Sequence, residues 1–180
     1  MSILVIAEHD NSELKGATLN TISAAKLIGS EIDLLVAGFN CSNVTESSSK
    51  IEGIKKVLIA DNQAYEHCLA ENIGSLVAKI GKDYTHILSP ATTNGKNFMP
   101  RVAALLDVAQ ISDVSSVISE DTFERPIYAG NCVATVLSKD SIKVMTIRTT
   151  GFDPCADTGG EALSKVIDIE DIPEDVAIDL

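Results

Sequence analysis

The part of the chain with the most groups capable of chemistry is a polar loop at residues 89–97, which contains three hydroxyls, two amides, a glycine and a lysine. It follows an apolar run and precedes a helical pattern. In an α/β fold it would therefore lie beyond the carboxyl end of a strand, where such folds bind ligands. The free N–H groups of a helix N-terminus can hold an anion there. The candidate ligand-binding residues are Thr92, Thr93, Asn94, Gly95 and Lys96.

The same loop departs from the Walker A phosphate loop at two positions. Pro90 stands where the first glycine should be, and Asn97 replaces the Ser or Thr that would bind magnesium. In the alternative interpretation the loop is structural: a polar residue at 92–94 caps the helix and Gly95 supplies the turn. The sequence favours capping, with nucleotide binding as the alternative.

A second group of candidates lies further along the chain and suggests ion pairs rather than a binding loop. Arg101 stands among apolar residues of a helical pattern, so we expect its guanidinium to reach a fixed carboxylate or carbonyl. Asp107 and Asp113 are the candidate partners in a structural network. Four polar residues on the strand-like segments that follow are candidates for an interface: Arg125, Tyr128, Asn131 and Arg148.

Other kinds of site find no support in the residue pattern. The loop at 8–16 has one glycine, too few for a dinucleotide fingerprint, and its three acids would repel a pyrophosphate. His9 in that loop has no demonstrable Ser or Cys neighbour to activate, so we expect a solvated or capping role. The four cysteines stand apart, without metal-ligand spacing. We therefore predict no catalytic residue and no metal site.

Composition narrows the class of protein further. The chain has 180 residues, 45% of them hydrophobic, which fits one well-packed domain. A formal net charge of −12 suits nucleic acid poorly, and 4% aromatic residues are too few for base stacking. No apolar run approaches the ~20 residues that span a bilayer. No basic leader follows Met1, so we expect a soluble intracellular protein without membrane insertion.

The elements that must position these residues alternate between strand and helix as far as residue 106. Strands are predicted at 3–7, 33–38, 56–60 and 85–89, and helices at 17–28, 44–49, 64–80 and 96–106. This alternation predicts an α/β fold with a doubly wound, mostly parallel sheet in three layers. Such a fold is of the Rossmann-like or adenine-nucleotide-α-hydrolase-like kind.

The pattern changes after residue 110. Strand-like segments at 111–119, 122–128, 132–137 and 142–148 are joined by turns too short for a crossover helix. We therefore predict an antiparallel strand extension at an edge of the sheet or beside it, with Pro126 on an edge strand. From residue 151 onward the chain is acidic and interrupted by proline and glycine, with seven acids and one lysine in its last twenty residues. This composition is typical of a linker or of a tail that needs a partner.

One long block makes the sequence recognisable. Ser89–Val108, followed by Ile111–Val114, closely resembles the N-terminal domain of electron transfer flavoprotein α subunits. Shorter matches lie at Leu4–His9, Thr18–Asn20, Leu35–Gly38, Arg125–Asn131 and Ile147–Phe152. The resemblance covers nearly all of residues 1–152 and implies an α/β domain there. It implies that residues 153–180 are an acidic linker toward a FAD-binding domain that this chain lacks.

The resemblance also implies a function. The α subunit pairs with a β subunit of similar fold. The heterodimer passes electrons from acyl-CoA dehydrogenases of fatty acid β-oxidation, and from other dehydrogenases, to a membrane quinone oxidoreductase and the respiratory chain. FAD is held by the C-terminal domain of the α subunit and AMP by the β subunit, so no cofactor-binding residue is expected in this chain.

On this interpretation the chain is the scaffold and interaction domain of an electron carrier rather than an enzyme. Its expected location is the bacterial cytoplasm, or the mitochondrial matrix in a eukaryote. The related α-like subunits of nitrogen fixation and carnitine metabolism share the domain. An independent AMP- or ATP-binding domain, using the loop at 92–96, is the alternative function.

Overall fold

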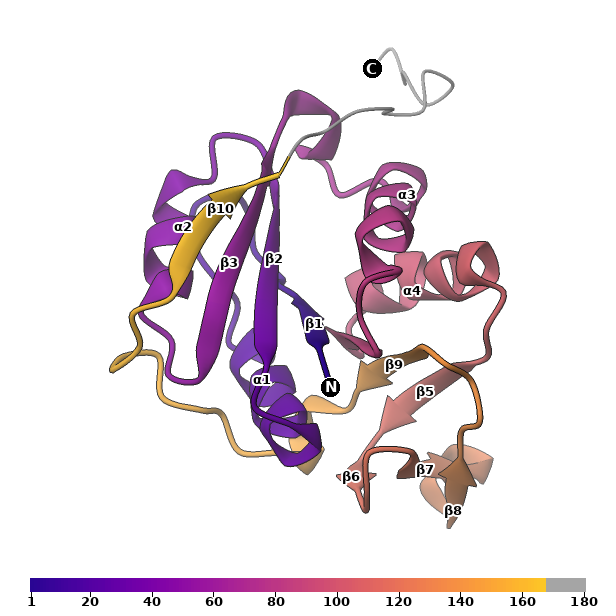
Figure 1. The fold of residues 1–180 in the computed structure, drawn as a ribbon. Coiled ribbons are helices and arrows are strands. Elements are labelled where there is room, and N and C mark those ends of the chain that lie inside the picture. Colours follow the sequence, from indigo (N-terminus) through magenta and orange to yellow (C-terminus); the bar gives the residue numbers. More distant parts are fainter. Residues whose placement is uncertain (168–180) are drawn as a thin grey trace.

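A seven-stranded parallel sheet forms the centre of the computed structural model, which describes residues 1–167 (Figure 1). Neighbouring strands are parallel throughout this sheet. In spatial order the strands are β10 (Leu163–Val166), β3 (Ile54–Asp61), β2 (Ile32–Gly38), β1 (Ile3–Ile6), β4 (His86–Pro90), β9 (Lys143–Ile147) and β5 (Gln110–Val114). The predicted α/β class with a mostly parallel sheet is confirmed.

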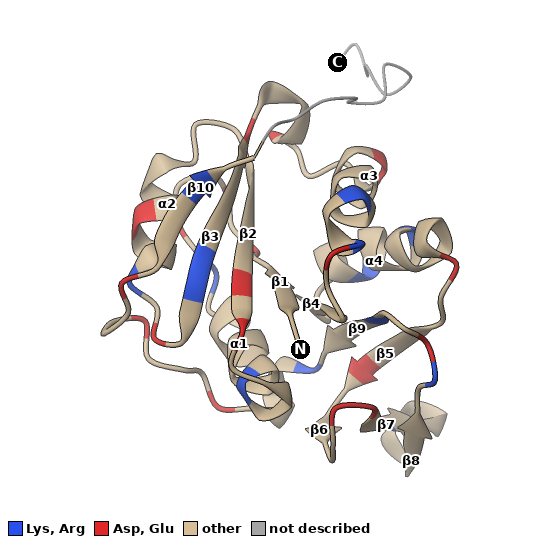
Figure 2. Cartoon of the chain, in the orientation of Figure 1, with Lys and Arg blue, Asp and Glu red and all other residues tan. Residues whose placement is uncertain are grey.

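Helices cover both faces of the sheet, which gives the three layers of a doubly wound fold. The helices α1 (Ala17–Ile28) and α2 (Ser42–Ser49) pack on one face, and α3 (Ala70–Gly81) and α4 (Thr93–Leu106) pack on the other. The central strands are continuous apolar runs because both of their faces are buried, as in β1, where all four residues are buried. Of these strands, β1 and β4 carry no charged residue, whereas β2 carries Asp33 near its beginning (Figure 2).

The strand order creates a switch point between β1 and β4. From β1 the chain proceeds outward to β2 and β3, and then returns to β4 on the other side of β1. The connections therefore diverge at this place. Doubly wound folds bind ligands in the crevice that forms there, outside the carboxyl ends of the strands.

The predicted helices differ in how well their ends match the structure. The range expected for α1 is confirmed, and the N–H of Gly29 closes the helix on the carbonyl of Ala25. The helix expected at 64–80 is shorter, because residues Gln63–Tyr65 form a separate 3-10 turn (η1) and α3 begins at Ala70. Cys68 has a φ of +51° and Leu69 is extended, so the helical path is interrupted between the two.

A three-stranded antiparallel sheet lies beside the main one, as predicted, but residues 111–114 of the strand expected at 111–119 belong to β5 of the parallel sheet. The antiparallel sheet contains β6 (Ser116–Val117), β7 (Thr122–Ile127) and β8 (Cys132–Leu137), and we call it the small sheet. A 3-10 turn (η2, Tyr128–Gly130) joins β7 to β8. Pro126 lies on the middle strand rather than on an edge strand. Because β6 pairs only with Phe123 and Glu124, however, no ladder bond from β6 is lost at Pro126.

The expectation that residues 142–148 are antiparallel is wrong. This segment forms β9, which pairs in parallel with β4 on one side and β5 on the other. Residues Val144 to Ile147 are all buried, and an unbroken apolar run of this kind belongs inside a parallel sheet. The small sheet takes the place of a crossover helix, since it carries the chain from the end of β5 back to the start of β9.

Part of the predicted linker is an edge of the main sheet. After a 3-10 turn (η3, Thr149–Gly151), the chain crosses α1 and passes α2. Gly159 bridges to Ile51, and Gly160 and Ala162 donate to backbone carbonyls at the end of α2. The chain then adds β10 in parallel to β3. The boundary at residue 152 stays a prediction, and residues 168–180 of the expected linker lie outside the described residues.

Candidate functional site

The polar loop after β4 is the N-terminus of α4, and Thr92 is its cap. The Thr92 hydroxyl accepts a hydrogen bond from the N–H of Gly95 at 3.4 Å, and the helix begins at Thr93, one turn before the predicted start. Thr93 and Lys96 are exposed on the first turn, and Asn94 is half-buried. Capping therefore accounts for the hydroxyl at 92, as the sequence favours.

Gly95 does not supply a turn, which corrects the expectation. It lies inside the first turn of α4, and it is not among the described glycines with a positive φ. Its role is close approach, because a Cβ at this position would come within 2.0 Å of the carbonyl oxygen of Pro90. The glycine lets the first turn of the helix press against the end of β4.

A carboxylate occupies the switch point. The Thr92 hydroxyl donates to Oε2 of Glu8 at 2.7 Å, which ties the end of β1 to the start of α4. Glu8 is half-buried, and its carboxylate lies at the N-terminus of α4, where a bound phosphate would have to lie. Two negative groups at this place would repel each other. This arrangement opposes nucleotide binding by residues 92–96.

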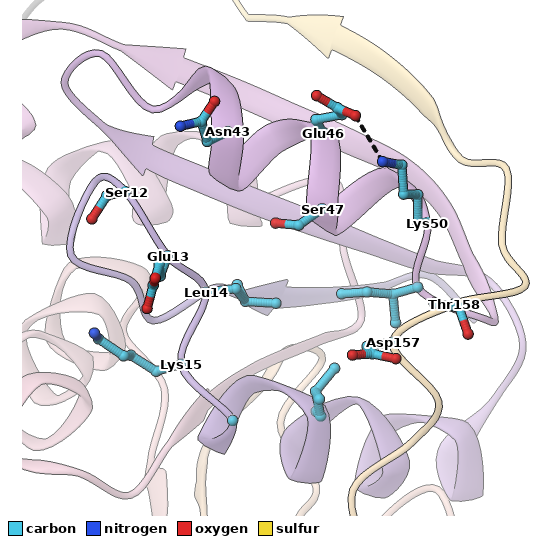
Figure 3. Close-up of a pocket in the computed structure, with 13 residues that line it drawn as sticks. Ser12, Glu13, Leu14, Lys15, Asn43, Glu46, Ser47, Lys50, Asp157 and Thr158 are labelled. Carbon is cyan, nitrogen blue, oxygen red and sulfur yellow. Dashed lines mark hydrogen bonds and ion pairs between the residues drawn. The ribbon is translucent and has the colours of Figure 1, made fainter.

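A groove of about 610 Å³ lies next to the loop that follows β1, and none of the predicted site residues lines it (Figure 3). Its apolar part is formed by Leu14, Leu19 and Ile51. Two lysines at its rim are paired: Lys15 with Asp10, and Lys50 with Glu46 at 2.7 Å. Each lysine at the rim therefore already has a carboxylate partner on the same surface.

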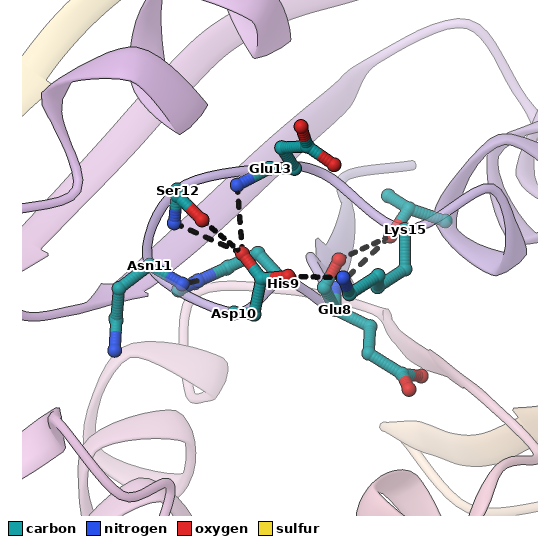
Figure 4. Close-up of polar contacts among 8 residues, drawn as sticks. Glu8, His9, Asp10, Asn11, Ser12, Glu13 and Lys15 are labelled. Carbon is teal, nitrogen blue, oxygen red and sulfur yellow. Dashed lines mark hydrogen bonds and ion pairs between the residues drawn. The ribbon is translucent and has the colours of Figure 1, made fainter.

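The loop after β1 is held by its own side chains (Figure 4). Asp10 accepts hydrogen bonds from the backbone N–H groups of Ser12 and Glu13, at 3.1 and 2.8 Å, and pairs with Lys15. These partners, the lysine first, hold the pKa of Asp10 well below its usual range. His9 is buried, and its Nδ1 accepts from the N–H of Asn11 at 3.1 Å.

Burial also lowers the pKa of His9, so the ring is neutral near pH 7. The expected solvated role of His9 is wrong because the ring is buried, and its hydrogen bond to the N–H of Asn11 stays within the loop and caps no helix.

Sequence reasoning missed Asn11, which connects three loops at the carboxyl edge of the sheet. Its side chain accepts from the N–H of Phe39 and donates to the carbonyl of Glu66, both at 3.0 Å. Gly38 permits this contact, since a Cβ there would lie 2.3 Å from Oδ1 of Asn11. Asn11 has a φ of +68°, which asparagine tolerates, but nothing nearby in the sequence indicates its distant partners.

The expected pairing of Arg101 with Asp113 or Asp107 is wrong. Arg101 is exposed, and its aliphatic part packs over Gly74 of α3, where an added Cβ would lie 3.0 Å from Cδ of the arginine. Within residues 1–167 its guanidinium has no hydrogen bond or ion pair. Asp107 instead ends α4 in the left-handed conformation, with a φ of +56°.

Asp113 pairs with Arg148. Oδ2 of Asp113 accepts from Nη2 of Arg148 at 2.6 Å and from Nε at 3.1 Å. The arginine holds the pKa of this carboxyl below its usual range. Arg125 lies nearby, with its Nε donating to the carbonyl of Ser112 at 2.7 Å. The structure thus brings together Arg125, Arg148 and Asp113.

Tyr128 and Asn131 lie apart from this group, at the tip of the β7–β8 hairpin. Asn131 donates to the carbonyl of Tyr128 at 2.9 Å. Tyr128 is 77% exposed, and both Tyr128 and Ala129 have positive φ values. Positive φ values of this kind are typical of tight turns, and the turn here leaves the Tyr128 ring projecting into solvent.

Neither a metal-ligand cluster nor a membrane-spanning helix occurs in the described part of the chain. Residues 1–167 contain no group of three or more His, Cys, Asp or Glu side chains arranged to hold a metal ion. Over the same residues, no helix has the length and apolar character needed to cross a bilayer.

Comparison with known proteins gives consistent matches. A family model described as "Electron transfer flavoprotein domain" matches residues 3–174. The chain is 62% identical over 162 residues to an electron transfer flavoprotein subunit alpha of Pseudomonas aeruginosa, which covers 90% of this chain and 52% of that protein. It is 49% identical over 176 residues to the mitochondrial protein of the same description from Dictyostelium discoideum, covering 93% and 49%.

A third relative is the electron transfer flavoprotein subunit alpha of Paracoccus denitrificans. It is 47% identical over 160 residues, which are 88% of this chain and 52% of that protein. The chain therefore spans about half the length of the curated relatives it matches.

Proposed function

Because the chain belongs to the electron transfer flavoprotein family, we propose that it is the N-terminal scaffold and docking domain of an α subunit. The match to α subunits over about half of their length supports this proposal. On this proposal, FAD is bound by the part of the α subunit that this chain does not span, and AMP is bound by the β subunit. The chain itself then carries no electrons.

The observation that carries the docking role is an exposed apolar patch on and beside the small sheet. We define this patch as Ile118, Tyr128, Val133 and Leu137, which are between 57% and 77% exposed. Val133 and Leu137 lie on one face of β8, four residues apart, so their side chains share a surface. Ile118 lies at one end of the small sheet and Tyr128 at the other, and large exposed apolar side chains on one such surface are typical of a protein–protein contact. The proposed occupant is the β subunit.

In the complete heterodimer the α and β subunits would accept electrons from acyl-CoA and other dehydrogenases. The bound FAD would supply the redox chemistry, and a membrane quinone oxidoreductase would receive the electrons. The contribution of this chain is mechanical: it holds the β subunit in place beside the flavin-binding part of its own subunit. The proposed location is the bacterial cytoplasm or, in a eukaryote, the mitochondrial matrix.

Sedimentation velocity of the chain mixed with its β subunit tests the docking role. We expect a one-to-one complex that Val133→Asp and Leu137→Asp weaken. Leu163→Asp is the matched control, since Leu163 is even more exposed but lies on β10 at the far edge of the main sheet. If the full α subunit binds the β subunit and this chain does not, the docking role is wrong.

Calorimetric titration with AMP, ATP and FAD tests the alternative of an independent nucleotide-binding domain. The Glu8 carboxylate beside Thr92 opposes a phosphate at the switch point, so we expect no binding heat from any of the three. Saturable binding of AMP that Thr92→Val abolishes would establish a nucleotide site in the chain.

A further inference from the structure

A cationic cluster surrounds Asp113 at the carboxyl ends of β5 and β9. Arg148 pairs with the Asp113 carboxylate, and Lys96 and Arg125 are close enough for their charges to lower its pKa as well. Asp113 is the one acid on β5 (red on that strand in Figure 2). Three cations around one acid leave excess positive charge, although the chain as a whole has a formal net charge of −12.

The backbone of β5 is distorted in a way that places this acid. Ile111 pairs with Met145 but Val114 pairs with Ile147, so β5 contains one extra residue at this point, a β-bulge. Asp113 adopts a φ of +62°, which is unfavourable for a residue with a side chain. Its N–H donates to the Thr146 hydroxyl at 2.9 Å, which holds the bulge in place. The bulge points the carboxylate toward Arg148.

Asp113 fixes Arg148 by one edge only. Nε and Nη2 of the arginine both donate to the same oxygen, Oδ2, in a side-on contact. The opposite edge of the guanidinium, formed by Nη1 and the second hydrogen of Nη2, has no hydrogen-bond partner within residues 1–167. The Arg148 side chain is 41% exposed. An end-on guanidinium fork matches the two oxygens of a carboxylate.

We propose that the free fork of Arg148 receives an aspartate or glutamate carboxylate of the β subunit. The inference rests on the proposed function and adds a charged contact to the apolar one. Arg125 lies on β7, the middle strand of the small sheet, where it pairs with Ala134 and so faces away from Val133 and Leu137; the charged contact is therefore separate from the apolar patch. Asp113 orients the fork, and Lys96 and Arg125 raise the positive potential around it.

Binding kinetics of the chain with its β subunit test this assignment, using the unaltered chain, Arg148→Gln and Arg148→Lys. We expect Arg148→Gln to weaken binding about tenfold or more at roughly 50 mM NaCl, and the loss to shrink at roughly 300 mM. Arg148→Lys keeps the charge but lacks the fork, so it should bind with intermediate affinity. The control Lys82→Gln removes a positive charge just after α3, near the amino end of β4, whereas Arg148 follows the carboxyl end of β9; this variant should bind like the unaltered chain.

The outcomes separate the two proposals. If the unaltered chain does not bind the β subunit, both fail. If it binds and Arg148→Gln binds equally well, the docking role stands and the carboxylate receptor does not. Should Arg148→Gln fail to fold by circular dichroism, the comparison of Arg148→Lys with the unaltered chain decides, and equal affinity overturns the inference. Binding of inorganic phosphate to the chain alone, lost in Arg148→Lys, would overturn the assignment to a partner carboxylate.

Discussion

Gly95 offers the sharpest test of how α4 is seated on the sheet. In Gly95→Ala the new Cβ would lie 2.0 Å from the Pro90 carbonyl oxygen and 2.7 Å from the Ser89 hydroxyl. The Pro90 oxygen belongs to the backbone of β4 and cannot rotate away as a side chain could. The start of α4 must therefore move away from β4 by more than an ångström. Overpacking of this severity costs about 3 kcal/mol, at the upper end of the usual range.

Two effects act on the stability of this variant in opposite directions. Alanine is favoured over glycine inside a helix by about 1 kcal/mol, which offsets part of the clash. The expected net loss in the free energy of unfolding is about 2 kcal/mol, or roughly 4–8 °C in Tm for a chain of this length.

Urea denaturation followed by circular dichroism measures this loss as a lower midpoint with an unchanged m-value. Gly16→Ala is the matched control, because Gly16 lies at the start of α1 with a φ of −56° and has nothing within 4 Å of an added Cβ. We expect it to be neutral or slightly stabilising. A Gly95→Ala variant as stable as the unaltered chain would refute the close-approach argument.

Three further predictions concern the groups around the sheet. Thr92→Val removes the cap of α4 and the hydrogen bond to Glu8, so it should lower the free energy of unfolding, measured in urea, by about 1–2 kcal/mol. Thr93→Val, on the exposed first turn, should change this free energy little. The pKa of Asp113 is lowered in the folded state, so its contribution to stability is present above about pH 4 and is lost as the pH falls. In Asp113→Asn, the free energy of unfolding should therefore change less between about pH 6 and 3 than in the unaltered chain. His86 is buried and donates from Nε2 to the carbonyl of Glu120 at 2.7 Å. Burial lowers the pKa of this histidine, so the unfolded chain binds the proton more readily and the free energy of unfolding should fall from pH 7 to 5. In His86→Gln the free energy of unfolding should fall less between pH 7 and 5. An equal fall in this variant would show that His86 does not cause the pH dependence.

Local patterns in the sequence predict a structural feature correctly when that feature depends only on residues close together in the chain. The apolar spacing of α1 and the glycine at 29 define that helix, and the structure confirms its range. The apolar run of β9 could have indicated a central strand, but which strands flank it depends on the whole topology. Short turns made an antiparallel arrangement the simpler prediction for that segment.

Partner choice in the candidate site could not be predicted for a similar reason. Arg101 and Arg148 are both plausible partners for Asp113 from their types alone. The direction in which each side chain leaves its element decides between them: Arg101 faces α3, and the bulge in β5 turns Asp113 toward Arg148. A bulge and a positive φ at an aspartate leave no clear signal in a single sequence.

The position of β10 has a consequence for how the chain could be shortened. β10 covers the backbone of β3 from Lys56 to Ile59. A version ending at residue 152 would expose those N–H and C=O groups as a template for strands of other molecules. Lys55 and Lys56 are exposed on β3, and their charges would oppose such pairing at the beginning of the edge only. A version that extends through residue 167 should therefore aggregate less than one cut at residue 152.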